Sequence, residues 1–518
     1  MNRVLRIAFF VLFLAACAAP AVSTPAPRAQ PFSYAPLSKP SAVFSATEEK
    51  PAAPTLTPSP EPSLTPSASP SATLPPPPSP TVETLPPTQT EPAPLSPFRA
   101  NYVIYALMDF PARTLSVSET IRYYNNSGAT LSEIVLAVEP NLWANVFSLE
   151  AATQNNAAIE NFSLDGQRLT LPLAQNLPAG AAADFKLDFT LALPQKGSGL
   201  FGYDYNQINL VDWYPFIVPY QNGWLLHEPA GFGEHLVYDA ADIEVNLQTD
   251  SNVTIAAPAP AEPNGEWTRY RLSGARTFSL SASDEFLTEE SAVGNTVIRS
   301  YYFSGYQAAA KSILYSATQA VSLYAAKFAP YPYETLAIVQ ADIHDGQEED
   351  GLVFLSSKFY GQYGGGAKNN LTTIGVHEIA HQWWFGLVGN DQAQEPWLDE
   401  AMSAYSEKIF YEYNYPNYGS WWWDFRVDYF SPSGYVDSSI YDQATFRAYT
   451  NAVYLHGAHF IDDLRIRMGD DDFFRFIKDY AARYARGRAA SADFFAVARE
   501  HTSADLTHLI ANYFAGSY

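Results

Sequence analysis

The sequence predicts a multidomain α+β protein in which an antiparallel β domain precedes a mostly helical domain. Three observations lead to this fold class. Residues 98–290 contain short runs of alternating apolar and polar residues, separated by turn signals such as Asn125–Gly128. Residues 291–518 contain longer stretches with apolar residues at helical spacing. Residues 18–97 show neither pattern, and a length of 518 residues allows about three structural units.

The N-terminal 17 residues have the anatomy of a secretory signal. Arg3 and Arg6 precede the apolar run Ile7–Ala16, which is too short to span a bilayer. Leu14–Cys17 resembles a bacterial lipoprotein lipobox, and the resemblance implies cleavage before Cys17 and a lipid anchor on its sulfur. This would place the protein outside the cytoplasm on a bacterial membrane. An ordinary signal peptide with an incidental cysteine is the alternative.

Residues 18–97 have the composition of a disordered tether. Of the chain's 39 prolines, 23 lie between Pro20 and Pro97, mixed with serine and threonine. Such a composition cannot bury enough apolar surface to fold. We expect this segment to hold a folded part away from the membrane. Because Cys17 is the only cysteine, no intrachain disulfide is possible and the folded part depends on its core.

The charge of the chain disfavours one class of partner. Asp and Glu number 54 against 30 Lys and Arg, which gives a formal net charge of −24. Binding to nucleic acid or to an anionic membrane surface depends on neutralising phosphate with basic side chains. We therefore expect no nucleic-acid partner and attribute the charge to an acidic surface.

Residues 98–290 read as sandwich-like antiparallel sheets, because their strands are short and regularly spaced. The expected strands include Tyr102–Tyr105, Leu115–Ile121, Ile134–Val138 and Phe185–Leu191. Two segments between strands are unusually aromatic, Leu210–Pro215 and Gly223–Trp224. We expect them to pack on the following domain, with a place at the edge of a cleft as the alternative.

Residues 291–518 open with a strand, a long helix and a second strand. Val297–Tyr302 alternates as a strand, and the alanine-rich stretch Gln307–Phe328 has helical periodicity. A second strand is expected at Leu336–Gln340. Beyond Glu400 the chain reads as mostly helical, with terminal helices at 473–484 and 492–501.

The strongest chemical signal is His377-Glu378-Ile379-Ala380-His381, followed after eighteen residues by Glu400. On a helix, residues four apart share a face, so the two imidazoles can hold one Zn²⁺. Glu378 is then placed to act on a metal-bound water, and Glu400 offers a third ligand. The alternative is an exposed helix with two incidental histidines. The apolar neighbours indicate instead a buried helix, where unpaired His and Glu side chains are costly.

This spacing, together with the following Ala401–Glu407, resembles the gluzincin family of alanyl aminopeptidases and leukotriene hydrolase, peptidase family M-one. The family reads H-E-x-x-H, then W-L-N-E-G-F-A-x-Y-x-E; here Asp399 stands for the Asn and Ala401 for the Gly. The resemblance implies a thermolysin-like catalytic domain with one Zn²⁺. It assigns as zinc ligands His377, His381 and Glu400. It makes Glu378 the general base and Glu407 a carboxylate that steadies a ligand.

The family also has G-x-M-E-N before this helix, and its Glu binds the free α-amine of the substrate. The resemblance puts Glu348 at that position, with Glu349 as the substitute. Asp345 then replaces the Gly, Gln347 the Met and Glu349 the Asn. A carboxylate at the end of a cleft can pair with an ammonium group. With Asp350 next to these acids, a solvated acidic loop is the alternative.

Tyr454-Leu455-His456-Gly457-Ala458 resembles the family's Y-x-K-G-A, with His456 in place of the Lys. The resemblance gives Tyr454 the role of hydrogen-bond donor to the tetrahedral intermediate, for which a neutral phenol is suited. Without the resemblance, Tyr454 is one of 34 tyrosines and could belong to the core.

Motif and resemblance together predict a membrane-tethered zinc metallopeptidase that acts on peptide substrates and releases their N-terminal residues. Two alternatives stay open. One is another hydrolytic specificity on the same site, such as an endopeptidase, and the other is a peptide-binding relative without catalysis. The remaining seven histidines show no second ligand spacing.

Overall fold

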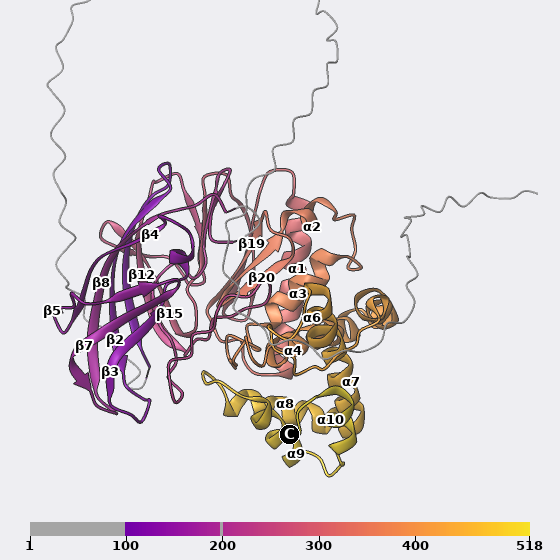
Figure 1. Cartoon of the computed structure of the whole chain (residues 1–518). Helices are drawn as coiled ribbons and strands as arrows, with labels where there is room; N and C mark the ends of the chain where they lie inside the picture. The colour runs from indigo at the N-terminus through magenta and orange to yellow at the C-terminus, as the bar shows by residue number, and fades with distance from the viewer. Residues whose placement is uncertain (1–98, 197–199) are drawn as a thin grey trace, which may run out of the picture. The chain divides into compact units, whose positions relative to one another are not determined.

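The computed structural model describes residues 99–196 and 200–518. The predicted signal, the lipidation site Cys17 and the tether therefore lie outside the described residues. A region of β-sheets, residues 99–283, precedes a region that combines one mixed sheet with helices, residues 287–518 (Figure 1). This order confirms the predicted fold class. Among the described helices, none is both long and apolar enough to cross a bilayer.

The β region has a large apolar core, to which Tyr333 and Phe385 of the second region also contribute. In β2, Leu115, Val117 and Ile121 are buried whereas Ser116 and Thr120 are exposed, as a half-buried strand requires. An eight-stranded sheet has the order β14 (Glu262–Asn264), β15 (Trp267–Ala275), β12 (Ala241–Gln248), β1 (Asn101–Asp109), β2 (Thr114–Tyr124), β8 (Ala182–Ala192), β4 (Phe147–Gln154), β5 (Ala157–Ala158). A four-stranded sheet has the order β11 (Phe216–Ile217), β3 (Leu131–Ala137), β7 (Arg168–Leu177), β6 (Ser163–Asp165). Another has the order β13 (Thr254–Ala256), β16 (Leu280–Ser283), β10 (Gln207–Leu210), β9 (Gly202–Asp204).

The aromatic segment after β10 differs from expectation. Trp213 is fully buried in the core of the β region, and its indole Nε1 donates to the carbonyl of Phe278 at 2.9 Å. The prediction that this segment packs on the following domain is therefore wrong for Trp213, because its ring belongs to the apolar core of the β region and bonds to Phe278 there. Its neighbour Asp212 instead borders a cavity described below.

The second region is built on a five-stranded sheet. Its order is β17 (Leu287–Val293), β18 (Thr296–Tyr302), β19 (Thr335–Ala341), β21 (Leu352–Ser356), β20 (Gly346–Glu349). The three central strands run parallel, and the edge strands β17 and β20 run antiparallel to their neighbours. Every residue of β19 is buried, as is typical of a parallel strand covered on both faces. The boundary predicted at 290/291 falls inside β17, so the second region begins earlier, at Leu287.

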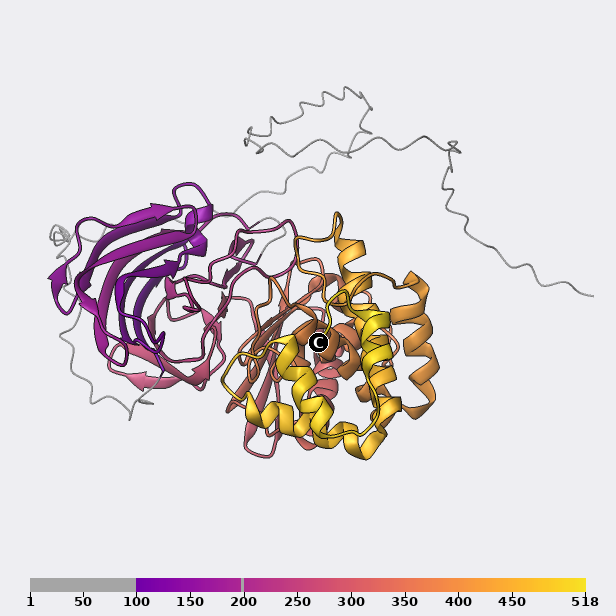
Figure 2. The ribbon, with the colours of Figure 1, turned by 60° about the horizontal axis from the view of Figure 1, so that its bottom comes forward.

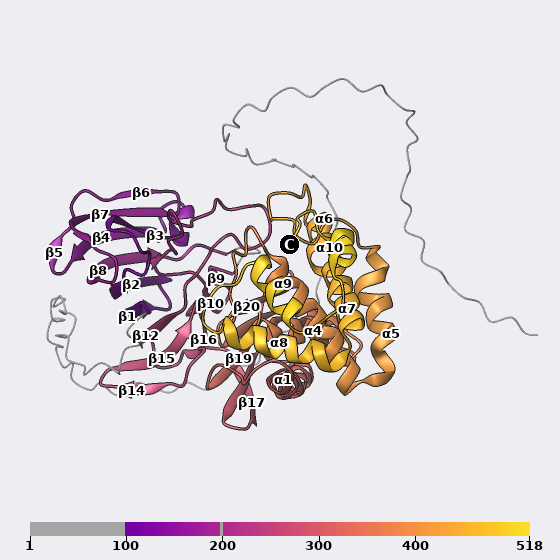
Figure 3. The ribbon, with the colours of Figure 1, turned by 90° about the horizontal axis from the view of Figure 1, so that it is seen from below.

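Helices cover this sheet and continue the chain. Helix α1 (Gln307–Lys327) and helix α3 (Asn370–Ala380) pack on the sheet and on each other (Figure 1). Helix α4 (Trp397–Asn414) packs on α3, and α7 (Gly457–Met468) packs on α4. Helices α8 (Asp470–Arg483) and α9 (Ser491–Glu500) follow on α7, and the yellow C-terminal helices lie together in Figures 2 and 3. The shorter helices are α2 (Ser357–Gly361), α5 (Gly419–Trp422), α6 (Phe446–Thr450) and α10 (Thr507–Tyr513).

The acidic stretch before α3 is a buried hairpin of β20 and β21, so the alternative of a solvated acidic loop is wrong. Glu348, Glu349 and Asp350 are all buried. The carboxylate of Asp350, at the turn, accepts hydrogen bonds from the backbone N–H groups of Arg276 and Thr277, the second at 2.9 Å. These bonds fasten the hairpin to the β region, and that attachment fixes where its carboxylates lie.

Candidate active site

The predicted ligand residues lie on two neighbouring helices. Helix α3 begins after Asn369, whose side chain accepts a hydrogen bond from the backbone N–H of Thr372 at 2.9 Å. His377 lies in the last turn of α3, and His381 follows directly at its end. Glu400 lies in the first turn of α4, which packs against α3. Local helical spacing and one helix pair therefore bring all three residues together.

Three potential ligand atoms converge between these helices. The Nε2 atoms of His377 and His381 are 3.2 Å apart. The Oε2 atom of Glu400 lies 3.2 Å from Nε2 of His377 and 3.4 Å from Nε2 of His381. A tetrahedral zinc site with bonds of about 2.0–2.1 Å has edges of roughly 3.3–3.4 Å between its ligand atoms. The three distances therefore match one face of such a tetrahedron, which leaves a fourth position for water or substrate.

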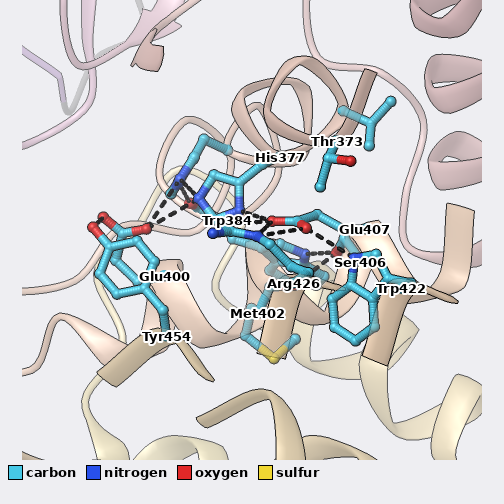
Figure 4. Close-up of polar contacts among 12 residues, drawn as sticks. Thr373, His377, Trp384, Glu400, Met402, Ser406, Glu407, Trp422, Arg426 and Tyr454 are labelled. Carbon is cyan, nitrogen blue, oxygen red and sulfur yellow. Dashed lines mark hydrogen bonds and ion pairs between the residues drawn. The ribbon is translucent and has the colours of Figure 1, made fainter. Parts of the chain in front are cut away.

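The other ring nitrogens fix the orientation of both imidazoles. Nδ1 of His377 lies 2.8 Å from Oε1 of Glu407, and Nδ1 of His381 lies 2.9 Å from the carbonyl of Trp384. Both partners accept hydrogen bonds and so favour a proton on each Nδ1; with a cation bound, each Nε2 can then present a lone pair to the space shared with Glu400. Figure 4 shows His377 between Glu400 and Glu407. Two lone pairs and a carboxylate oxygen that face one another fit a bound cation.

Glu407 is held in turn by two further side chains. It lies two turns after Glu400 on α4, so both carboxylates lie on one face of the helix. Trp422 Nε1 donates to its Oε2 at 2.9 Å, and Arg426 Nη2 donates to its Oε1 at 2.9 Å (Figure 4). Burial opposes the ionisation of Glu407, but the charge of Arg426 and the contact with His377 outweigh it and lower the pKa of Glu407.

The titration of this cluster also favours a cation. Burial disfavours a charged imidazole, but hydrogen bonds to Glu400 and Glu407 raise the pKa of His377 to about 9. Burial likewise opposes the ionisation of Glu400, yet its bonds to His377 and His381 lower its pKa to about 2. The surrounding carboxylates thus stabilise a positive charge at the histidines. A divalent cation bound between the histidines and Glu400 would provide that charge in place of the protons.

Glu378 faces the cavity beside the ligands, directly against strand β20. A Cβ atom on Gly346 would lie 2.2 Å from Oε1 of Glu378, so only a glycine leaves room for this carboxylate. Burial raises the pKa of Glu378 to about 8, against the opposing charges of His377 and His381. A carboxylate with a raised pKa beside the ligands suits a group that takes up and releases a proton.

Tyr454 lies on the other side of the ligands, in a π-helical turn formed by Asn451–His456. Its ring stacks on the ring of His377, with centroids 5.9 Å apart and 8° between the planes. Its hydroxyl donates to Oε1 of Glu400, the oxygen that does not face the histidines (Figure 4). Burial raises the pKa of Tyr454 well above its usual value, so the phenol is neutral and can donate a hydrogen bond. Single π-helical turns are frequent at functional sites.

The two acidic candidates of the hairpin lie in different surroundings. The carboxylate of Glu348 belongs to a group with Glu378 and His381 whose nearest ligand atoms lie within 4.8 Å of one another. Glu349 follows Glu348 on β20, and neighbouring residues of a strand face opposite sides. Its electrostatic neighbours are Asp212 and the hydroxyl of Thr277 in the β region. The structure thus brings Glu348, and not Glu349, next to the predicted base.

Two departures from the family pattern have local explanations. Oδ1 of Asp399 accepts a hydrogen bond from the backbone N–H of Glu400 at 2.9 Å. Burial and the charge of Glu400 raise the pKa of Asp399 well above its usual value, so the protonated side chain offers one acceptor and one donor, as asparagine does. At the second position, the absence of a side chain at Gly457 makes room for the methyl group of Ala401.

Two adjoining cavities lie over these residues. A cavity of about 230 Å³ is bordered by the three ligand residues, Glu378 and Tyr454. A second cavity of about 440 Å³ extends from it between the hairpin and the β region. The segments 233–234 and 345–348 border both cavities, so the two spaces meet at Glu348.

Sequence reasoning missed the residues that the β region contributes. Glu234 brings a carboxylate oxygen within 4.8 Å of those of Glu348 and Glu400. Asp212 and Glu139 border the larger cavity. No motif marks Glu234 or Glu139. Only the aromatic stretch around Asp212 indicated, as an alternative, a place at the edge of a cleft.

The second region matches a known family model. Residues 314–513 match the model described as Peptidase family M1 domain. Aminopeptidase M1-B of Oryza sativa subsp. japonica is 25% identical over 240 residues, which are 43% of this chain and 27% of that protein. Endoplasmic reticulum aminopeptidase 1 of Mus musculus is 27% identical over 177 residues, 32% of this chain and 19% of that protein. The match thus spans less than a third of the length of these curated relatives.

Solved structures extend the likeness to most of the described chain. An M1 zinc metallopeptidase from Deinococcus radiodurans covers 80% of this chain and 94% of its own, with a TM-score of 0.58 and 16% identity. A mutant of an M1 zinc metallopeptidase from Deinococcus radiodurans, bound to the substrate Tyr-Ser-Ala, covers 81% and 95%, with a TM-score of 0.58 and 16% identity. At this identity the likeness shows a shared fold.

Proposed function

Residues 314–513 are a peptidase family M1 domain, and from that premise we propose that this protein is a zinc metallopeptidase that releases N-terminal residues from peptides. One observation carries the proposal. His377, His381 and Glu400 present three ligand atoms at the spacing of a tetrahedral zinc site, with Glu378 beside them. Relatives that are aminopeptidases, and zinc metallopeptidases of the same fold, support it.

The donor set fits one Zn²⁺, which His377, His381 and Glu400 would hold. When bound, the ion lowers the pKa of a water molecule and polarises a peptide carbonyl. Glu407 and the Trp384 carbonyl keep both imidazoles oriented for this, through the hydrogen bonds to their Nδ1 atoms.

Two side chains handle the proton and the developing charge. Glu378 accepts the proton of the attacking water and passes it to the leaving amine, because its carboxylate faces the cavity beside the ligands. Tyr454 donates its hydroxyl hydrogen to the oxygen that becomes negative. Its present bond to Glu400 already places that hydroxyl at the ligand cluster.

The free amine of the substrate pairs with carboxylates at the end of the smaller cavity. Glu348 and Glu234 bring carboxylate oxygens within 4.8 Å of each other there. An ammonium group held between them fixes the first peptide bond, rather than a later one, over the ligands.

The activity is tested with one alanine-leading peptide in free and N-acetylated forms. We expect the purified protein to cleave only the free peptide, to lose activity with a chelator and to regain it with zinc. Cleavage of both forms would leave the zinc chemistry standing and exclude an amine requirement. If zinc-loaded protein cleaves neither form, a peptide-binding role without catalysis replaces the proposal.

We also propose that the enzyme acts outside the cytoplasm, anchored to a bacterial membrane by lipid on Cys17 and spaced from it by residues 18–97. The lipobox-like Leu14–Cys17 and the proline-rich composition support this arrangement. In cells, Cys17→Ser should move the protein from the membrane fraction to the soluble fraction, measured by fractionation and blotting. Unchanged membrane association would exclude the lipid anchor.

A further inference from the structure

The larger cavity starts where the proposed amine site ends. It measures about 440 Å³ and shares Glu234, Gly346 and Glu348 with the cavity over the ligands. In an N-terminal residue, one carbon carries the ammonium group, the carbonyl to be attacked and the side chain. If the carbonyl lies at the ligands and the ammonium group at Glu348, the side chain points into this larger cavity.

The walls of this cavity are unusually acidic. Six carboxylates border it, from Glu139, Asp212, Glu234, Asp345, Glu348 and Glu349. Among the described residues that line it there is no lysine or arginine, and His235 and His344 are the basic side chains present. His235 lies 3.3 Å from Glu139, so this pair is partly matched. The five other carboxylates therefore outnumber the basic side chains that line the cavity.

One carboxylate of this lining has an oxygen without a hydrogen-bond partner. Glu349 is only 4% exposed, and its Oε2 has no hydrogen-bond partner in the described structure. Asp212, beside it, accepts a hydrogen bond from the hydroxyl of Tyr238 at 2.7 Å. Asp212 also has a φ of 48°, a left-handed conformation that is uncommon for a residue other than glycine. A buried carboxylate oxygen without a partner is costly unless a ligand supplies a donor.

Desolvation raises the pKa of both acids, so a nearby cation would change their ionisation. Desolvation and the charge of Glu139 raise the pKa of Asp212 to about 7. Desolvation and the charge of Asp212 raise the pKa of Glu349 well above its usual value. A cation placed between them would favour their ionised forms and supply the missing donors.

Apolar side chains also border the cavity. Trp143, Phe201, Val211 and Phe385 border it, and the rings of Trp143 and Phe201 lie with centroids 5.2 Å apart. A lining that combines apolar side chains with carboxylates suits a side chain with an aliphatic stem and a charged head.

We propose that this cavity binds the side chain of the substrate's first residue and selects arginine or lysine, with Asp212 and Glu349 as the residues that recognise the positive charge. The inference rests on the proposed aminopeptidase function and names its substrate class. A neutral side chain of the same length would fill the cavity but leave Oε2 of the buried Glu349 without a donor.

Matched substrates test the selection directly. The full chain, loaded with zinc, is assayed on the fluorogenic amides of arginine and citrulline, which differ in charge and hardly in size, and of lysine and norleucine. We expect kcat/KM to be about 10- to 100-fold higher for each cationic member, the range that corresponds to one buried polar group left unsatisfied by the neutral substrate. Equal values for arginine and citrulline would overturn the proposal.

Variants assign the selectivity to residues. In Glu349→Gln and in Asp212→Asn the arginine-to-citrulline ratio should fall towards one. A ratio within one variant is independent of how much enzyme is folded or metal-loaded. Glu266→Gln, an exposed acid in the turn between β14 and β15, is the control and should keep both the ratio and the activity. A ratio that stays at the wild-type value in both cavity variants would overturn the assignment.

Calorimetry separates this inference from the proposed function. Free L-arginine should bind the zinc-loaded chain at least about tenfold more tightly than L-citrulline, and the difference should shrink in Glu349→Gln. If no amide is hydrolysed, alanine amide included, the peptidase proposal fails. The binding preference for L-arginine over L-citrulline still tests whether the cavity selects a cationic side chain. If alanine amide is hydrolysed but neither ratio nor binding depends on charge, only the cavity proposal fails.

Discussion

Replacing Glu407 by glutamine should weaken metal binding without touching a ligand. The carboxylate is fully buried and accepts hydrogen bonds from His377, Trp422 and Arg426. Glu407→Gln keeps the size of the side chain but removes the negative charge behind His377, which makes Nε2 a poorer donor to a cation. Loss of a partner of this kind lowers metal affinity by 10- to 100-fold, or about 1.4–2.7 kcal/mol. Zinc affinity is measured by competition with a chromophoric chelator.

The same change should also lower stability, through Arg426. Its guanidinium side chain is 19% exposed and is paired with Glu407. Removing one partner of a buried ion pair lowers the free energy of unfolding by about 3–5 kcal/mol. Because Arg426 is partly exposed, we expect a loss near the lower end of this range. Arg426→Gln should destabilise the apoprotein by a similar amount, and the double variant by less than the sum of both, because it leaves no unpaired charge. Thermal unfolding of the four proteins measures this coupling.

If Glu407→Gln binds zinc within about threefold of the wild-type affinity, the reasoning is refuted. The hydrogen bond and the negative charge at Nδ1 of His377 would then have no effect on metal binding by this histidine. Arg426→Gln is the discriminating control, since it removes a contact of Glu407 but leaves the carboxylate behind His377.

Three further predictions concern the residues around the ligands. Glu378→Gln should bind zinc normally but lose about 10²–10⁴-fold in kcat, measured with a fluorogenic amide; retained turnover would exclude Glu378 as the base. Tyr454→Phe should lose about 10²–10³-fold in kcat with little change in KM, and an effect confined to KM would contradict its role as donor to the oxyanion. Gly346→Ala would place a methyl group 2.2 Å from Oε1 of Glu378 and displace this carboxylate. Zinc content should therefore persist while activity falls, and full activity would show that β20 or Glu378 can shift without consequence for catalysis.

The ligand set could be predicted from sequence because its geometry is local. His377 and His381 are placed by a single turn of one helix, and Glu400 by the first turn of the helix packed against it. The predicted Val297–Tyr302 strand and Gln307–Phe328 helix correspond to β18 and α1 for the same reason, since periodicity is a property of contiguous residues.

The surroundings of the ligands could not be predicted, because they depend on contacts between distant segments. Nothing in the sequence of β20 tells which of Glu348 and Glu349 faces the ligands; the pairing of β20 with β21 and the bonds from Arg276 and Thr277 to Asp350 decide it. Glu234 and Asp212 reach the cavities only because loops of the β region meet that hairpin. Their roles appear in three dimensions and have no local signature.

The origin of the cavity walls has a consequence for how such an enzyme can change. The ligands, Glu378 and Tyr454 all come from residues after 370, whereas Glu139, Asp212 and Glu234 come from the β region, before residue 240. If the proposals above hold, bond cleavage depends on residues after 370, whereas the choice of substrate depends on both regions, through Asp212 of the β region and Glu349 of strand β20. A graft of the β region from a relative should alter which peptides are cut and leave the cleavage step intact, whereas residues 287–518 expressed alone would keep the reactive groups and lose the part of the cavity wall that the β region contributes.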